Sequence, residues 1–166
     1  MRRSGMTSGR MARCALLVAL AMVLSWLESL VPVSAAVPGV KLGLANLVVI
    51  FSLYRMGFRE AAVISLVRVI LVSATFGNAY SFAYSLAGAA LSLGVMALLK
   101  RTGKFSILGV SIAGGVCHNL GQILVAMAVL GRGEIIWYLP ALLAAGTVAG
   151  VAVGVLGGVL TRRITL

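Results

Sequence analysis

Six apolar segments separated by short polar stretches set the pattern of this chain. A helix needs about 20 apolar residues to cross a bilayer, and most of the segments come close to that length. The pattern predicts an all-α integral membrane protein, with six transmembrane helices in a single domain over residues 12–166. Residues 1–11 are polar and basic and form the expected cytoplasmic tail. The predicted spans are residues 12–31, 42–54, 61–76, 80–99, 106–130 and 135–160.

The composition agrees with a membrane protein. Hydrophobic residues make up 61% of the 166 residues, and charged residues only 10%. A soluble domain carries about a quarter charged residues, so this chain cannot cover a soluble surface. The net charge of +11 does not indicate nucleic-acid binding, because the cations lie between apolar segments and form no basic helix. Both cysteines fall in apolar segments and none of the Cys and His residues has metal-ligand spacing, so we expect no disulfide, metal or cofactor.

The cations alternate along the chain as the positive-inside rule requires. Lys41 and Arg132 fall in predicted outer stretches and Arg68 falls inside a span, which leaves 11 of the 14 cations in predicted cytoplasmic stretches. Both termini are therefore expected in the cytoplasm. The alternative for the first segment is a cleaved secretory signal, with a basic start and small residues at 33–35. It would leave five spans in the same orientation.

Polar side chains gather in the predicted outer half of the membrane. Ionisable side chains inside a membrane are rare and point to function, and Arg68 and His118 lie near the middle of their spans. We expect a ligand cavity that opens to the outside, with these two residues at its floor. The alternative is structural, with Arg68 paired to Glu28 and the other polar groups joining helices. Two stripes of small and polar residues accompany them: Ser81, Ser85, Gly88 and Ser92 on the fourth span, and Ser111, Gly115, His118 and Gln122 on the fifth. The predicted ligand-binding residues are Lys41, Asn46, Arg68, Asn78, Ser85, His118, Asn119 and Gln122.

Two patterns of small residues favour close helix packing. The sixth span has a glycine at every fourth residue from Gly146 to Gly158. We expect this face to pack inside one molecule, and a dimer interface is the alternative. The first span carries Ala15 and Ala19 at the same spacing.

Several motifs of the chain resemble those of the heptaprenyl diphosphate synthase component I family, also called the Gx transporter family. The likeness runs from about Leu27 to the end, in order and at the spacing of the family. It implies a six-helix bundle in the bacterial plasma membrane, similar to the substrate-binding S-components of energy-coupling-factor transporters. Those components dock their transport module through small residues on the first helix, and Ala15 and Ala19 match that pattern. The motifs are residues 38–46 (PGVKLGLAN), 57–61 (GFREA), Arg68, 76–78 (FGN), 85–88 (SLAG), 118–122 (HNLGQ) and 138–140 (YLP).

The enzymatic name of that family does not suit the acids of this chain. Prenyl-chain elongation uses aspartate-rich motifs that hold magnesium against a diphosphate, since Mg²⁺ prefers carboxylate and phosphate oxygens. The chain contains no aspartate, and its three acids, Glu28, Glu60 and Glu134, are far apart in the sequence. We therefore expect no enzymatic activity from the chain alone.

Two functions remain open. The preferred one is an S-component-like binding or transport subunit for a small molecule linked to isoprenoid or quinone metabolism. Because no GxxxxGK[ST] motif for ATP occurs, active uptake would need an energy-coupling ATPase module as partner. The alternative is a non-catalytic membrane accessory subunit of a soluble polyprenyl (heptaprenyl) diphosphate synthase.

Overall fold

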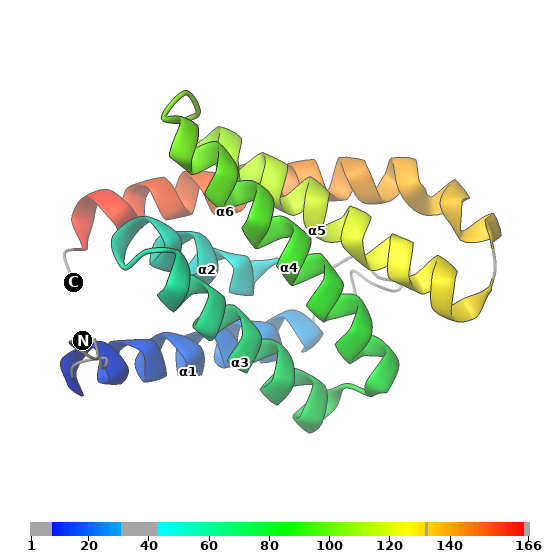
Figure 1. Ribbon diagram of the computed structural model, residues 1–166, viewed down its shortest axis with the longest axis horizontal. Helices are drawn as coiled ribbons and strands as arrows, with labels where there is room; N and C mark the ends of the chain where they lie inside the picture. Colours follow the sequence, from blue (N-terminus) through cyan, green and yellow to red (C-terminus); the bar gives the residue numbers. More distant parts are fainter. Residues whose placement is uncertain (1–7, 31–42, 132, 165–166) are drawn as a thin grey trace, which may run out of the picture.

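The computed structural model describes residues 8–30, 43–131 and 133–164, and nearly all of these residues are helical. No strand occurs among them. The prediction of an all-α fold is therefore confirmed (Figure 1). The elements are α1 (Ser8–Leu30), α2 (Leu44–Arg55), α3 (Phe58–Phe76), α4 (Ala79–Thr102), α5 (Ile107–Leu130), the 3-10 helix η2 (Gly133–Tyr138) and α6 (Leu139–Arg163).

Two helix boundaries differ from the predicted spans. Helix α1 begins at Ser8, so the last part of the expected polar tail is helical. Helix α6 begins at Leu139 and not at residue 135, because η2 occupies the intervening residues. Pro140 stands in the first turn of α6, where its missing N–H costs no hydrogen bond.

Four helical segments are long and apolar enough to cross a membrane, namely α1, α4, α5 and η2 together with α6. Helix α2 is shorter, with 12 residues. Helix α3 has 19 residues but carries Arg59, Glu60 and Arg68. Large apolar side chains also point outward, for example Leu16 on α1 and Val148 on α6, which are 70% and 71% exposed. These features indicate a membrane protein, and the crossing of the bilayer by α2 and α3 stays a prediction.

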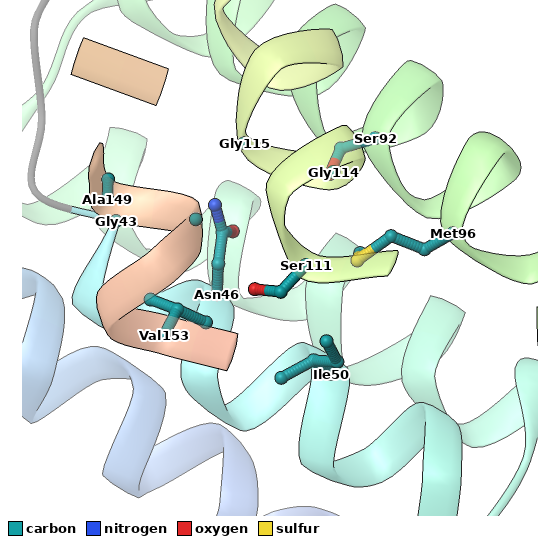
Figure 2. Close-up of a pocket in the computed structure, with 11 residues that line it drawn as sticks. Gly43, Asn46, Ile50, Ser92, Met96, Ser111, Gly114, Gly115, Ala149 and Val153 are labelled. Carbon is teal, nitrogen blue, oxygen red and sulfur yellow. The ribbon is translucent and has the colours of Figure 1, made fainter. Parts of the chain in front are cut away.

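The short helix α2 lies at the centre of the bundle. Seven of its 12 residues are buried, from Ala45 to Leu53. Its residues Val48 and Phe51 pack with α1 and α3, while Val49 and Ile50 pack with α3, α4, α5 and α6. Figure 2 shows the side of α2 that faces α5 and α6. A helix surrounded in this way is apolar over most of its circumference, as its sequence is.

Glycines bring the backbones of α5 and α6 into contact. A Cβ atom on Gly115 would lie 2.3 Å from the carbonyl oxygen of Gly146, and one on Gly150 would lie 2.6 Å from Cα of Ile112. Gly154 meets the same helix at Leu108, whereas no atom of the described residues lies within 4 Å of a Cβ on Gly158. Packing inside one molecule is thus confirmed for three of the four glycines of the predicted face.

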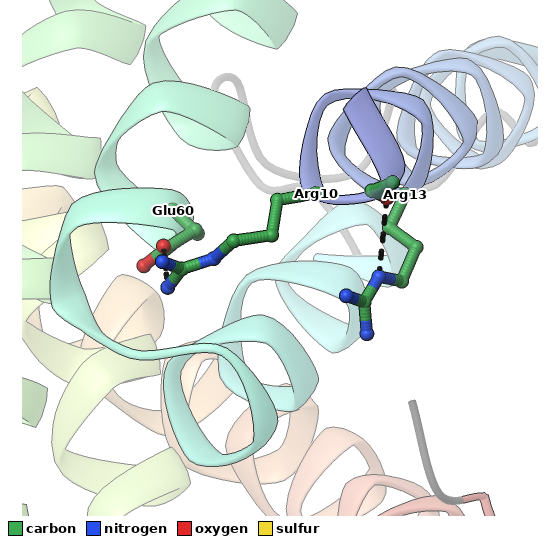
Figure 3. Close-up of polar contacts among 4 residues, drawn as sticks. Arg10, Arg13 and Glu60 are labelled. Atoms are coloured by element: carbon green, nitrogen blue, oxygen red, sulfur yellow. Dashed lines mark hydrogen bonds and ion pairs between the residues drawn. The ribbon is translucent and has the colours of Figure 1, made fainter. Parts of the chain in front are cut away.

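Cations tie several helix ends together at one end of the bundle. Arg10 of α1 reaches Glu60 at the start of α3, with 2.5 Å between Nη2 and Oε1 (Figure 3). The first turn of α1 and the last turn of α6 both lie at this end (Figure 1). Which side of the membrane this end faces stays a prediction. Two further links are Lys100 Nζ to the Leu53 carbonyl (2.5 Å) and Arg55 Nη2 to the Ile164 carbonyl (2.6 Å).

Candidate ligand-binding site

A polar cavity lies between five helices, and we call it the Arg68 cavity. Its empty volume is about 360 Å³, including space that opens to the surroundings, and the centre of a water molecule fits into about 30 Å³ of it. A cavity needs roughly 10–15 Å³ by the second measure to hold one water, so this one holds a few waters or a small polar group. Its wall is formed by Glu28, Gly43, Asn46, Arg68, Gly115, His118, Asn119, Gly146 and Ala149.

Arg68 supplies the permanent positive charge of this cavity. The residue is half-buried in the middle of α3, although the helix is otherwise apolar there. Its Nε atom is buried and has no hydrogen-bond partner among the residues that the structure describes. A buried polar atom without a partner is costly. Arg68 therefore keeps one unused N–H donor, at Nε, for an acceptor that enters the cavity.

Glu28 brings a negative charge to the same wall from the end of α1. Its Oε1 accepts a hydrogen bond from the backbone N–H of Gly43, the residue before α2. The carboxylate also interacts electrostatically with Arg68. The cavity thus carries opposite charges from two different helices, α1 and α3.

Helix α5 contributes His118 and Asn119, and the second of these also has a structural role. Asn119 is 5% exposed, and its Nδ2 donates to the carbonyl oxygen of Leu142 on α6 at 2.7 Å. His118 lines the cavity and packs against α4, where a Cβ on Gly88 would lie 3.1 Å from its Cε1. The two side chains therefore fix α5 between its neighbours and present polar atoms to the cavity.

The structure brings half of the predicted ligand-binding residues together. Asn46, Arg68, His118 and Asn119 line one cavity, and Lys41 lies outside the described residues. The other three, Asn78, Ser85 and Gln122, lie elsewhere. Ala15 and Ala19 are exposed on α1, so a partner could reach them.

Asn78, Ser85 and Gln122 are not among the residues that line the Arg68 cavity. Asn78 caps α4, with its side chain accepting from the N–H of Ser81 at 2.8 Å. Gln122 faces α4, where a Cβ on Gly88 would lie 2.9 Å from its Cγ. Ser85 is half-buried on α4. A role for these three in ligand binding stays a prediction.

Glu28 was not among the predicted ligand-binding residues, whereas the structure places it in the cavity wall. The sequence did mark Glu28 as a candidate for a functional role, because a lone acid near the end of an apolar segment is energetically costly in a membrane. Of the small residues of the wall, Gly43, Gly115 and Gly146 stood in patterns that the sequence showed, whereas Ala149 gave no signal. Among the described residues, no three His, Cys, Asp or Glu side chains come together as metal ligands would.

The comparison with protein families agrees with the resemblance of the motifs. The family model for heptaprenyl diphosphate synthase component I matches residues 17–160. No curated protein and no solved structure matches the chain. The match covers α2 to α5, most of α1 and most of α6, and hence every residue of the Arg68 cavity. The chain belongs to the heptaprenyl diphosphate synthase component I family.

Proposed function

We propose that the protein is a membrane subunit that binds a small molecule in the Arg68 cavity and delivers it across or into the membrane. The observation that carries the proposal is a polar cavity inside an apolar bundle, with a buried Arg68 Nε that has no partner among the described residues. Charged groups in such a place are expensive and rarely kept for packing alone. A ligand that accepts hydrogen bonds would compensate this group.

The ligand that suits this wall carries an anionic or carbonyl-rich end. Arg68 donates to acceptors through a planar fork, and Asn46, His118 and Asn119 add polar atoms around it. Lys41, which lies outside the described residues, stays among the residues that we propose to contact the ligand. The metabolic context that we propose, isoprenoid or quinone metabolism, follows from the family and not from the shape of the cavity.

Transport would require a partner that supplies energy, because the chain has no ATP-binding motif. The exposed face of α1 with Ala15 and Ala19 is the proposed docking surface for such an ATPase module. Its exposure supports the proposal, because small residues on a lipid-facing helix permit close approach of another helix.

A second function is favoured by the description of the family. A component of heptaprenyl diphosphate synthase can be a membrane subunit that holds or feeds a soluble catalytic partner. The lack of any aspartate is compatible with a non-catalytic component. In this case the partner would be a polyprenyl diphosphate synthase. The polar side chains around the Arg68 cavity would then only join the helices of the bundle.

Purification in a mild detergent from its own cells, followed by mass spectrometry, separates the two functions. The first predicts an ATPase module among the associated proteins and a retained small molecule that is lost in Arg68→Met. The second predicts a prenyl synthase and no small molecule that depends on Arg68. Arg59→Met is the matched control, because Arg59 is exposed on the same helix. Retention of the same molecule by Arg68→Met would contradict binding in this cavity.

A further inference from the structure

A second cavity lies beside the first, and we call it the Ser111 chamber. Its empty volume is about 270 Å³ including open space, and the centre of a water molecule fits into about 20 Å³ of it. By the usual threshold of roughly 10–15 Å³ for one water, one or two non-hydrogen atoms fit. It is lined by Gly43, Asn46, Ile50, Ser92, Met96, Ser111, Gly114, Gly115, Ala149, Gly150 and Val153.

The Ser111 chamber adjoins the Arg68 cavity. Four residues line both spaces, namely Gly43, Asn46, Gly115 and Ala149. Three of the four are glycine or alanine, so the Asn46 side chain is the largest group in the shared wall. A molecule that fills the Arg68 cavity can therefore extend past Asn46 toward Ser111.

The chamber contains polar side chains that the protein itself does not satisfy. Ser92 and Ser111 are each 3% exposed, and neither hydroxyl makes a hydrogen bond to another described residue. Ser52 on α2 differs, because its hydroxyl donates to the carbonyl of Val48 at 2.7 Å. Figure 2 shows the side chains of Asn46 and Ser111 directed toward the same space.

Hydroxyl groups without partners in an apolar interior cost free energy, so the occupant of this space is expected to form hydrogen bonds. It is also expected to be uncharged, because none of the described residues that line the chamber is ionisable. Ile50, Met96 and Val153 make the rest of the wall apolar and close to the main core.

We propose that the Ser111 chamber is an inner subsite for an uncharged hydrogen-bonding end of the ligand, such as a hydroxyl or carbonyl group. This rests on the proposed function of the Arg68 cavity, which would hold the acceptor-rich end. The ligand class is then a small molecule with an anionic or carbonyl-rich end and a narrow neutral polar end. A ligand with a bulky or alkyl inner end does not fit.

The connection between the two spaces can be tested with silver ion, which is close to water in size and binds thiols. Cys14 and Cys117 are first replaced by alanine, and Ser111→Cys is compared with Val110→Cys. Val110 is the control because it precedes Ser111 on α5 and is 0% exposed in the core. Silver binding is followed as the fraction of thiol protected from alkylation after denaturation.

Ser111→Cys should react about tenfold or more faster than Val110→Cys, since the second thiol becomes accessible only when the helices open locally. Ala149→Leu, which narrows the passage between the two cavities, should remove most of the difference in rate between the two cysteines. Equal rates for the two cysteines, or no effect of Ala149→Leu, would overturn the proposal of a connected chamber. This result does not depend on whether a ligand is found.

The role in binding is tested by Ser92→Ala with Ser111→Ala. The small molecule that mass spectrometry finds on the wild-type protein should bind about fivefold or more weakly, from the loss of two neutral hydrogen bonds. A contrary result is that Ser111→Cys reacts with silver while the double serine-to-alanine variant binds the molecule with unchanged affinity. This result would show that the chamber only holds water, and it would refute the subsite. If the wild type retains no molecule, the proposed function fails, and the subsite fails with it.

Discussion

Replacement of Arg68 by methionine separates a binding role from a structural one. Methionine keeps most of the length of the side chain but removes the charge and all five donors. Hydrogen bonds to a charged group contribute about 1.5–3 kcal/mol. If one such bond joins Arg68 to the ligand, affinity should fall by about 10- to 150-fold, at 1.4 kcal/mol for each factor of ten.

The effect on stability depends on how far Glu28 relies on Arg68. Removal of one partner from a buried ion pair costs about 3–5 kcal/mol when the other charge is left alone. Here the Glu28 carboxylate also accepts the N–H of Gly43, and Arg68 is only half-buried. We therefore expect Arg68→Met to lower stability by much less than that range.

The assay combines three measurements on detergent-purified protein: size-exclusion profile, thermal unfolding and ligand retention by mass spectrometry. The double variant Arg68→Met with Glu28→Gln is compared with the single variant, because glutamine keeps the acceptor for Gly43 but carries no charge. We expect both variants to stay folded and both to lose binding, while Arg59→Met behaves as wild type. An unfolded single variant together with a double variant that folds and binds fully would refute the reasoning, because Arg68 would then be only a partner for Glu28.

Three further predictions follow from the topology, the acids and the glycines. In a background without Cys14 and Cys117, a membrane-impermeant thiol reagent outside the cell should label Ala79→Cys and not Thr102→Cys; the reverse pattern would invert the predicted orientation. Ala79 is chosen because its neighbour Asn78 caps α4. The purified protein with Mg²⁺ should not elongate prenyl diphosphates, since it has no aspartate cluster, and product formation in a radiolabel assay would contradict this. Gly150→Ala should lower the melting temperature, because overpacking costs about 1–3 kcal/mol and its Cβ would lie 2.6 Å from backbone. Gly158→Ala is the matched control, with nothing within 4 Å, and should be neutral or stabilising, as alanine favours helix by about 1 kcal/mol. Equal effects of the two would show that the α5–α6 contact does not limit stability.

The number and order of the helices could be predicted from the sequence, because each apolar segment is bounded by glycine or by charges. The glycine face of α6 was equally readable, since spacing of four residues places small residues on one side of a helix. The start of α6 was predicted too early, because the apolar residues of η2, such as Ile135 and Ile136, continue the pattern. Pro140, in the first turn of α6, is the sequence signal for the true start, because proline is favoured at that position.

Only part of the site could be predicted, because the sequence does not show in which direction a polar side chain points. A residue that is costly in a membrane, such as Arg68 or His118, stands out wherever it points. An uncharged residue such as Ser85 or Gln122 can face a neighbouring helix as easily as a cavity, and sequence alone does not decide between them. Asn78 shows the same ambiguity, because the residue type that suits a ligand also suits the cap of a helix.

The shortness of α2 explains why a cavity exists in this bundle. Twelve residues at 1.5 Å each give a helix of about 18 Å, whereas the hydrocarbon core of a bilayer is about 30 Å thick. A central helix of this length fills only part of the space that its neighbours enclose. Gly43 and Asn46, at its beginning, line both cavities, so the spaces open where α2 starts. The longer helices α1, α3 and α5 continue past this level and provide Glu28, Arg68 and His118 there. The polar residues are therefore placed at the level where α2 begins and where the two cavities lie, which is the position that a ligand or water would have to occupy.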